Sequence, residues 1–373
     1  MLHYNALTRL VLENQTIKDV IISSDFGCAI NIHPFSTNHV LTASAVLSQK
    51  KRINLVRFFC GYYFEILLRL RRIRMTPMDI TLIFCYHIYM ITYLQAIIIG
   101  FIQGISELFP ISSLGHSVIL PKLVGWNINQ NDPFFLTFLV ATHLATALVL
   151  FVFFWKDWIN ILKGLGRSLA QRQIKSDDTW AKVGWLLVVG TIPTGILGLL
   201  FKESLQSLFA SPKIAALFLI LNGAVLYGAE ILRKKAPESG HESYQKIAKL
   251  SWWQAIKVGL SQILALIPGL SRSGSTMAGS LLVGLSNEDA ARFSFLLATP
   301  IIGAAAALSL PDFLKPQNYY LIGPSLAGAV AAAIAAYFSV KFLVKYFHTN
   351  KLTPFAVYCA VAGVVYSVIL YFR

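Results

Sequence analysis

Two short stretches of this sequence concentrate polar and charged side chains within otherwise apolar surroundings. The first stretch carries Gln103, Glu107, Ser112, Ser113 and His116. The second stretch carries Gln262, Ser271, Arg272, Ser273, Ser275 and Thr276. Hydroxyl, imidazole, carboxylate and guanidinium groups together are the side chains that bind phosphate and transfer a phosphoryl group. These two stretches are therefore the candidates for a phosphate-handling site.

The second stretch has the features of an anion-binding turn. Gly269 and the serines after it would leave backbone N–H groups free at the start of a helix, whose positive dipole end attracts phosphate. Arg272 supplies a planar fork that matches phosphate oxygens. Neutral hydroxyl donors beside it are Ser271, Ser273 and Thr276. An ion pair between Arg272 and Glu107 is the alternative interpretation, but such a pair does not require so many hydroxyl groups.

The first stretch offers a nucleophile and proton carriers. Ser113 and His116 are three residues apart, so on a helix after Pro110 they would share a face and act on one phosphorus as nucleophile and base. Glu107 could orient His116, move a proton, or hold a divalent cation that bridges a diphosphate. The remaining residues of the predicted diphosphate-binding set are Gln103, Ser112 and Gln262.

The composition places these residues in a membrane. The chain is 56% hydrophobic and 13% charged, with a mean hydropathy of +0.62, whereas soluble domains are about 45–50% apolar and about 25% charged. The net charge of +15 is gathered between apolar runs, which suits the control of membrane topology better than nucleic-acid binding. We expect no nucleic-acid partner, and the four cysteines have no spacing typical of disulfides or metal sites.

Six apolar runs have close to the ~20 residues that a helix needs to cross ~30 Å of hydrocarbon. They are 136–155, 183–201, 214–232, 293–310, 321–341 and 354–372. Two further stretches, 91–125 and 252–286, are interrupted by Pro, Gly and Ser. Each of these predicts two half-helices in a re-entrant hairpin, which membranes tolerate where the irregular backbone is buried or lines a wet cavity. The predicted fold is an all-α polytopic membrane protein with six transmembrane helices and two re-entrant helical hairpins.

The two broken stretches also resemble each other. G-x-x-Q occurs at 100–103 and at 259–262, and P-x-x-S follows at 110–113 and at 268–271. Because three spans follow each hairpin, the second copy would be inverted relative to the first, an architecture whose broken helices meet near the midplane. We predict repeats over about 91–232 and about 252–372. The alternative is that Pro and Gly merely kink two ordinary helices.

Basic residues predict the orientation. They gather in the connections 156–182, 233–250 and 342–353, which belong in the cytoplasm by the positive-inside rule. The C-terminus is then outside. The first hairpin enters the membrane from outside and the second from inside.

Residues 1–89 differ from the rest of the chain. They mix short polar stretches with a basic run over 50–74 and show no signal-peptide pattern. We expect a poorly structured extension from a misassigned start, followed by a membrane domain over 90–373. The expected initiator is Met90, with Met75 and Met78 as alternatives.

Three blocks of residues resemble the undecaprenyl-diphosphate phosphatase family, also called the bacitracin-resistance family. The blocks are Gly104-Ile-Ser-Glu-Leu-Phe-Pro-Ile-Ser-Ser-Leu-Gly-His116, Pro268-Gly-Leu-Ser-Arg-Ser-Gly-Ser-Thr276 and Ala290-Ala-Arg-Phe-Ser-Phe-Leu-Leu-Ala298. The resemblance covers about 90–373, and Leu114 departs from the Thr or Ser that is common there. It implies hydrolysis of undecaprenyl diphosphate to the monophosphate and phosphate, which recycles the carrier lipid of peptidoglycan synthesis and confers bacitracin resistance.

The resemblance also implies a location and a site. The expectations are the bacterial inner membrane, a polyprenyl diphosphate lipid as substrate, and a divalent cation, Mg²⁺ or Ca²⁺, with Glu107 as its candidate ligand; a homodimer is left open. By motif match, the catalytic positions are Glu107, Ser113, His116 and Arg272. Whether Ser113 or His116 attacks phosphorus stays open, with Ser113 favoured.

Two other classes of protein compete with this interpretation. A transporter or lipid-phosphate flippase also uses inverted repeats and a midplane site, but a carrier does not need Ser113 beside His116. The other integral-membrane lipid phosphatase family carries a Lys-x6-Arg-Pro block and a His after its Ser-Arg. This sequence has no such Lys block, and no His follows Arg272 at the required distance.

Overall fold

The computed structural model describes residues 20–23, 29–32, 91–126, 128, 130, 133–201, 211–233, 243–313 and 322–372. The chain divides into two compact units, Met1–Phe84 and Cys85–Arg373. In the first unit, the described residues form strands β1 (Val20–Ser23) and β2 (Ala29–Ile32), which pair antiparallel. The predicted domain boundary and the three candidate initiators lie outside the described residues.

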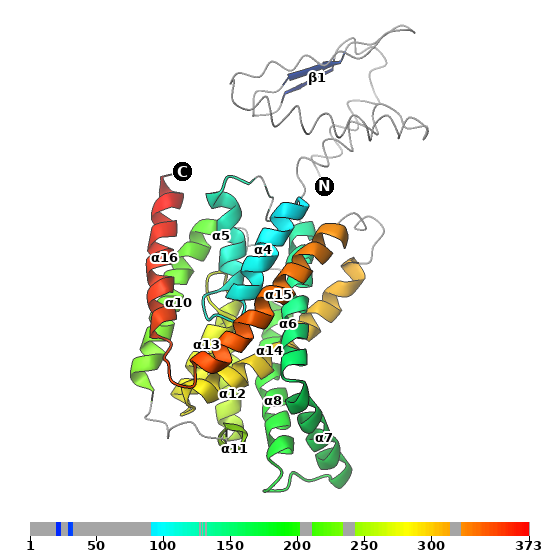
Figure 1. The fold of residues 1–373 in the computed structure, drawn as a ribbon, viewed down its shortest axis with the longest axis vertical. Coiled ribbons are helices and arrows are strands. Elements are labelled where there is room, and N and C mark those ends of the chain that lie inside the picture. The colour runs from blue at the N-terminus through cyan, green and yellow to red at the C-terminus, as the bar shows by residue number, and fades with distance from the viewer. Residues whose placement is uncertain are drawn as a thin grey trace. The chain divides into compact units, whose positions relative to one another are not determined.

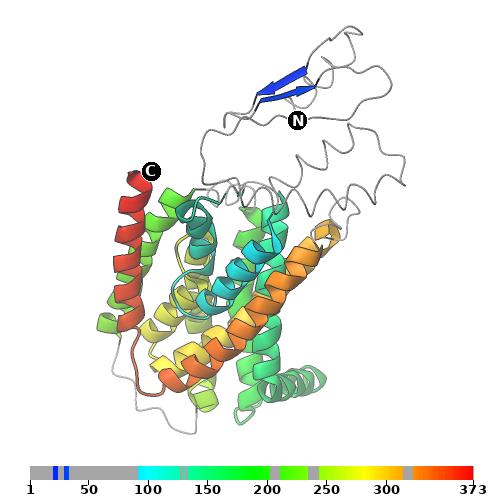
Figure 2. The ribbon, with the colours of Figure 1, turned by 45° about the horizontal axis from the view of Figure 1, so that its top comes forward.

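The described part of the second unit is built from helices and turns and contains no strand (Figures 1 and 2). In chain order its elements are α4 (Tyr93–Ser106), α5 (Ser113–Leu123), α6 (Pro133–Phe153), α7 (Trp155–Gln171), α8 (Thr179–Leu200), α10 (Pro212–Leu232), α11 (Ser243–Ala248), α12 (Trp252–Ser261), the 3₁₀ helix η1 (Gln262–Leu266), α13 (Arg272–Leu282), α14 (Asn287–Phe313), α15 (Ile322–Tyr346) and α16 (Thr353–Tyr371). The predicted all-α membrane fold is confirmed.

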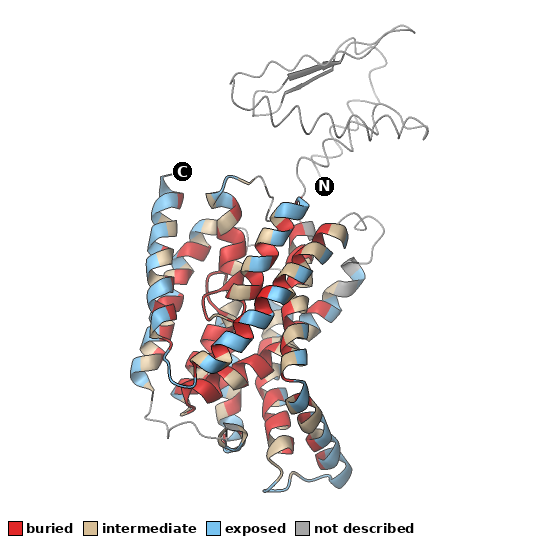
Figure 3. Ribbon diagram, viewed as in Figure 1, coloured by how far each residue is buried: buried red, intermediate tan, exposed pale blue. Residues whose placement is uncertain are grey.

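Six helices are long and apolar enough to cross a membrane within the described ranges. They cover Phe135–Phe153, Thr179–Leu200, Pro212–Leu232, Asn287–Ser309, Ile322–Tyr346 and Thr353–Tyr371. Each matches one of the six predicted runs to within a few residues. Their outward sides are exposed (Figure 3) and apolar, as at Val152, Leu199 and Val361. A surface of this kind is stable against lipid rather than water, so the chain is a multi-pass membrane protein.

One predicted loop is largely a helix. The sequence predicts an irregular connection over 156–182, but α7 fills its first half. Trp158 and Ile161 are buried, whereas Lys163 and Arg167 are exposed. Apolar residues at helical spacing with charges on the opposite side make an amphipathic helix. The prediction is wrong here because such a helix is not apolar along its whole length, and only the spacing of its apolar residues indicates it.

Each broken segment packs closely on a spanning helix of the other half of the chain. Figures 1 and 2 show α4 lying along α15, and α12 packs on α8 in the same way. A Cβ atom on Gly100 would collide with the backbone of Gly328, and one on Gly259 would collide with the backbone of Gly190. Small residues permit such close helix packing in membranes. Gly100 and Gly259 are the first residues of the two G-x-x-Q motifs.

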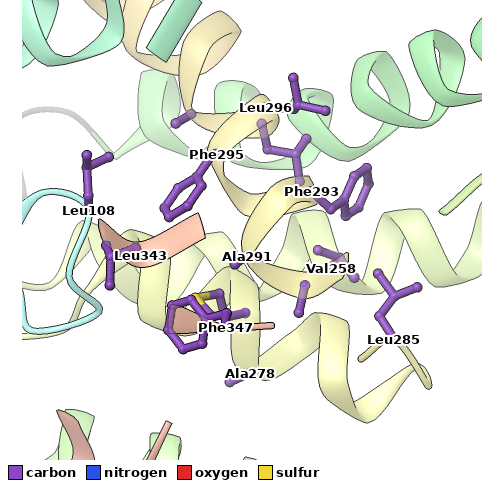
Figure 4. Packing of buried hydrophobic residues seen from close by; sticks show 14 of the residues in the cluster. Leu108, Val258, Ala278, Leu285, Ala291, Phe293, Phe295, Leu296, Leu343 and Phe347 are labelled. Atoms are coloured by element: carbon purple, nitrogen blue, oxygen red, sulfur yellow. The ribbon is translucent and has the colours of Figure 1, made fainter. Parts of the chain in front are cut away.

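The turn after α4 is anchored in the main hydrophobic core. Leu108 lies in this turn and is fully buried. The same cluster contains Phe293 and Phe295 of α14, Leu343 of α15, and Phe347 directly after α15 (Figure 4). A well-packed core tolerates little displacement of its side chains. Glu107, directly before Leu108, is therefore held at a fixed position.

Candidate active site

The two broken segments bring their turns into contact. Helix α4 ends at Ser106 and α5 begins at Ser113, so residues 107–112 form the first turn. Arg272, the first residue of α13, donates from Nη2 to Oε1 of Glu107 at 2.8 Å. Ser273 donates its hydroxyl to the Glu107 backbone carbonyl at 3.1 Å. Residues 165 positions apart thus form one buried polar cluster.

Glycines allow the two turns to approach this closely. Gly269 has φ +99°, and a Cβ there would collide with the Ala215 carbonyl of α10. A Cβ on Gly115 would lie 3.1 Å from the Gly269 Cα, and one on Gly274 would lie 3.2 Å from the Pro110 carbonyl oxygen. Only glycine suits position 269, because the backbone there is left-handed and a Cβ atom would have no space.

Asn222 of α10 fastens the two turns together. Its Nδ2 donates to the Pro110 carbonyl oxygen of the first turn at 3.0 Å, and its Oδ1 accepts from the Ser271 backbone N–H of the second turn at 3.0 Å. The side chain is fully buried. Sequence reasoning missed this residue, although a lone amide within the apolar run 214–232 was a usable signal, because buried polar groups need partners.

Glu107 is the centre of the site. Besides Arg272 on Oε1, its Oε2 accepts from the Ser113 hydroxyl at 2.6 Å and from Nε2 of Gln103 at 3.0 Å. His143 Nε2 lies 3.2 Å from the same Oε2. Glu107 with Gln103, Ser113, His143 and Arg272 is called the Glu107 cluster below. It joins the hydroxyl group of Ser113 to two groups that can carry positive charge.

His143 was also missed by sequence reasoning. It lies on α6, and its Nδ1 is 2.7 Å from the Leu139 carbonyl oxygen. A carbonyl oxygen and a carboxylate only accept hydrogen bonds, so both contacts are satisfied when each ring nitrogen carries a proton and the ring is an imidazolium. With Arg272 at +1 and Glu107 at −1, the cluster then has a net charge of +1. An ionisable residue inside an apolar span was the available signal.

His116 has partners different from those expected. Its Nδ1 is 2.7 Å from the Ser112 carbonyl oxygen, and its Nε2 is 2.8 Å from the Tyr358 hydroxyl of α16. In the neutral ring, Nδ1–H donates to Ser112 and Nε2 accepts from Tyr358. Ser113 is the first residue of α5, and its side chain turns back toward Glu107. The structure thus pairs Ser113 with Glu107 and His116 with Tyr358.

The other predicted residues form hydrogen bonds with backbone groups. Ser112 caps α5 by accepting from Gly115 N–H at 3.2 Å, with its own φ at 71°. Ser271 caps α13 in the same way, and Thr276 donates to the Arg272 carbonyl at 2.7 Å. Gln262 donates to the Gly190 carbonyl of α8 at 3.2 Å. The predicted residues that meet at Glu107 are Gln103, Ser113, Arg272 and Ser273.

The residues around Glu107 do not fit a protein-held metal ion. Both carboxylate oxygens already accept from donors, and Arg272 and His143 beside them are cationic groups that would repel a metal. No group of three or more His, Cys, Asp or Glu residues is placed to hold a metal in the part of the chain that the structure describes.

The fold and this site define a multi-pass helical membrane protein with a buried interior centre suited to an anionic, phosphate-bearing ligand. The chain belongs to the family of the bacitracin resistance protein BacA, whose model matches residues 96–365. It is 45% identical over 293 residues to an undecaprenyl-diphosphatase of Mycolicibacterium paratuberculosis, covering 73% of this chain and 95% of that protein. It is 40% identical over 337 residues to undecaprenyl-diphosphatase 2 of Frankia alni, covering 74% and 98%. A third relative, from Gluconacetobacter diazotrophicus, is 44% identical over 286 residues and covers 75% and 97%.

Proposed function

We propose that this chain hydrolyses undecaprenyl diphosphate to undecaprenyl phosphate and inorganic phosphate. This reaction recycles the lipid carrier for peptidoglycan synthesis and confers bacitracin resistance. The observation that carries the proposal is the Ser113 hydroxyl, 2.6 Å from one oxygen of Glu107 while Arg272 holds the other oxygen at 2.8 Å. A nucleophile, a proton acceptor and a phosphate-binding fork thus share one buried site in a family whose curated relatives are named undecaprenyl-diphosphatases.

The diphosphate binds against the positive side of the Glu107 cluster. Arg272 presents a planar fork at the N-terminus of α13, where the helix dipole also favours an anion. The incoming phosphate oxygens compete with Glu107 for this guanidinium. As Arg272 shifts its hydrogen bonds toward phosphate, the Glu107 carboxylate loses a donor and becomes a better proton acceptor.

The reaction then proceeds in two displacements. The Ser113 oxygen attacks the terminal phosphorus and its proton passes to Oε2 of Glu107, while the bond to the bridging oxygen breaks and polyprenyl monophosphate leaves. Water next attacks the phosphoserine phosphorus, the bond to Ser113 breaks, and Glu107 returns the proton to Ser113. The protons of the water leave with inorganic phosphate. Gln103 keeps Oε1 buried without a partner among the described residues, an acceptor suited to holding this water.

Trapping of the phosphoenzyme decides between the two candidate nucleophiles. Acid-quenched protein should carry phosphate in an acid-stable, alkali-labile form, as a phosphoserine does. Ser113→Ala should form no phosphoenzyme, whereas His116→Ala should still form it. Ser367→Ala, a serine change on α16 outside the site, is the matched control. An acid-labile, alkali-stable adduct would instead assign the attack to His116.

Purified protein in detergent distinguishes an enzyme from a carrier. We expect release of inorganic phosphate from undecaprenyl diphosphate with no bilayer present, and we expect Arg272→Ala to abolish it. Binding of the lipid without phosphate release would favour a carrier.

The membrane arrangement is part of the proposal. Helices α4 and α5 have 14 and 11 residues, fewer than the ~20 that a span needs, which supports a re-entrant hairpin. Figure 1 shows α5 in the upper half of the bundle and α12 and α13 in the lower half, as inverted hairpins from opposite leaflets would lie. The membrane is the bacterial inner membrane, where the lipid carrier is used.

The residues around Glu107 would not hold a divalent cation. If the reaction uses Mg²⁺ or Ca²⁺, the substrate would carry the ion, because its phosphate oxygens attract hard cations. Calorimetry should then show no Mg²⁺ binding to the substrate-free protein. The absence of a nucleic-acid partner and the homodimer stay predictions, and light scattering of the detergent-solubilised protein checks the homodimer.

A further inference from the structure

A cavity of about 260 Å³ lies between α4, α5 and α16, directly beside the site. Most of its wall is aliphatic, from Ile102, Ile105, Ile111, Ile119, Leu120 and Leu123. Among its polar wall residues, Ser106 donates its hydroxyl to the Ile102 carbonyl at 2.6 Å, and His116 and Tyr358 bond to each other at 2.8 Å. Its volume is close to the lower end of the about 300–1,000 Å³ of typical ligand pockets. The chemistry of this wall fits a hydrocarbon ligand.

We propose that this cavity binds the first prenyl units of the substrate lipid, next to its diphosphate. The proposal rests on the proposed function and adds to it the place of the hydrocarbon chain. It makes Leu120, Ile105 and Tyr358 specificity-determining residues for a branched chain attached to the diphosphate.

His116 connects the cavity to the catalytic residues. One ring nitrogen bonds to the Ser112 carbonyl, next to Ser113, and the other bonds to the Tyr358 hydroxyl. Both His116 and Tyr358 line the cavity. A lipid whose terminal phosphorus lies at Ser113 therefore finds apolar walls on the far side of His116, where its chain begins.

The size of the cavity limits how much of the chain it holds. From His116 to Leu123 the wall follows α5 over eight residues, and the seven rises between them give a length of about 10 Å. Tyr358 is 41% exposed on the apolar outer side of α16, so the cavity has its edge at the lipid-facing surface. Only the proximal units fit inside, and the rest of a long chain lies in the bilayer.

Because lipid is as apolar as the cavity wall, the cavity gains little from the hydrophobic effect. Its contribution is orientation, since van der Waals contact with a branched chain fixes the angle at which the diphosphate meets Ser113. The enzyme should therefore require a short prenyl chain but respond weakly to further length.

Two soluble substrates test this inference. Farnesyl diphosphate has a chain long enough to fill the cavity, whereas the single prenyl unit of dimethylallyl diphosphate reaches only its His116 end. Leu120→Trp and Ile105→Phe fill the cavity and should lower kcat/KM for farnesyl diphosphate roughly tenfold or more, with dimethylallyl diphosphate changed by no more than about twofold. Val361→Trp, on the exposed side of α16, is the matched control and should change neither value.

An equal loss on both substrates, or no loss on either, would overturn the cavity assignment. Failure of the wild-type protein to hydrolyse farnesyl diphosphate while it hydrolyses undecaprenyl diphosphate would also overturn the cavity assignment, whereas failure to hydrolyse undecaprenyl diphosphate would overturn the proposed function instead. A second measurement needs no variant: a benzophenone analogue of farnesyl diphosphate should label wild-type peptides of α4, α5 or α16. Labelling confined to other helices would contradict the proposal.

Discussion

At the scale of single residues, the site depends on how one carboxylate divides its oxygens. Oε1 of Glu107 holds Arg272, and Oε2 holds Ser113, Gln103 and His143. In the proposed mechanism, binding of a phosphate at Arg272 acts on the proton of Ser113 through this shared carboxylate. A lysine in place of Arg272 would supply the positive charge but not the planar fork, which bonds to both Glu107 and the Ser294 carbonyl.

His143 is predicted to contribute through its charge. His143→Gln removes the positive charge beside Glu107 while keeping a hydrogen-bond donor. The lost charge weakens the attraction of the cluster for the anionic phosphoryl group in the transition state, an effect of about 1.5–3 kcal/mol, so kcat should fall roughly ten- to hundredfold. Steady-state phosphate release measures this loss.

A purely structural role for His143 would show differently. His143→Gln should keep the midpoint of thermal unfolding of the wild-type protein, and the loss should appear in kcat rather than only in KM. A lowered midpoint with an unchanged kcat would contradict the electrostatic role.

Asn222 is predicted to contribute to stability. Asn222→Ala leaves the Pro110 carbonyl and the Ser271 N–H buried without their partner. An unsatisfied buried group costs about 1–3 kcal/mol, so thermal unfolding in detergent should begin at a lower temperature. Asn350→Ala, at an exposed position, is the control. Equal unfolding midpoints in the two variants would show that Asn222 does not fasten the turns.

At the scale of elements, the site depends on helices that stop short of a full crossing. Helix α4 ends at Ser106, so the carboxylate of Glu107 lies at the break instead of on a lipid-facing helix. In the second broken segment, the irregular backbone ends at Ser271, so Arg272 is the first residue of α13. Irregular backbone at this depth persists because its polar groups are satisfied by Asn222 and by the two serine caps.

Close helix packing at Gly259 is predicted to be essential. Gly259→Ala would drive a methyl group into the Gly190 backbone of α8, and overpacking of this kind costs about 1–3 kcal/mol. Gly195→Ala on α8 is the matched control, because nothing lies within 4 Å of a Cβ there. Thermal unfolding should be earlier for Gly259→Ala and unchanged or later for Gly195→Ala. The same midpoint for both variants would contradict the close approach.

At the scale of the whole molecule, the distribution of charge orients the bundle. Basic residues gather on α7 and in the connections before α8, α12 and α16, which the positive-inside rule predicts to lie in the cytoplasm. An alkaline phosphatase fused after Arg373 should therefore be active in cells, and a fluorescent protein at that position should be dark. The opposite pair of results would reverse the orientation and both hairpins with it.

Sequence alone determined the six spans, the two breaks and most of the Glu107 cluster. Hydrophobic runs of the length of a bilayer identify spans without tertiary information, and the repeated G-x-x-Q and P-x-x-S motifs identified the breaks. Glu107, Ser113 and Arg272 were recognisable because charged and hydroxyl groups are costly in such surroundings unless they have a function.

Only the tertiary structure decided which side chains touch. Three of the contacting residues come from helices that do not contain the breaks: His143 from α6, Asn222 from α10 and Tyr358 from α16. Each of these side chains lies in an apolar run. Local spacing predicted His116 as the partner of Ser113, yet Glu107 takes that place. The physical reason is that periodicity fixes the face on which a residue lies, whereas contacts across the bundle depend on how helices pack on one another.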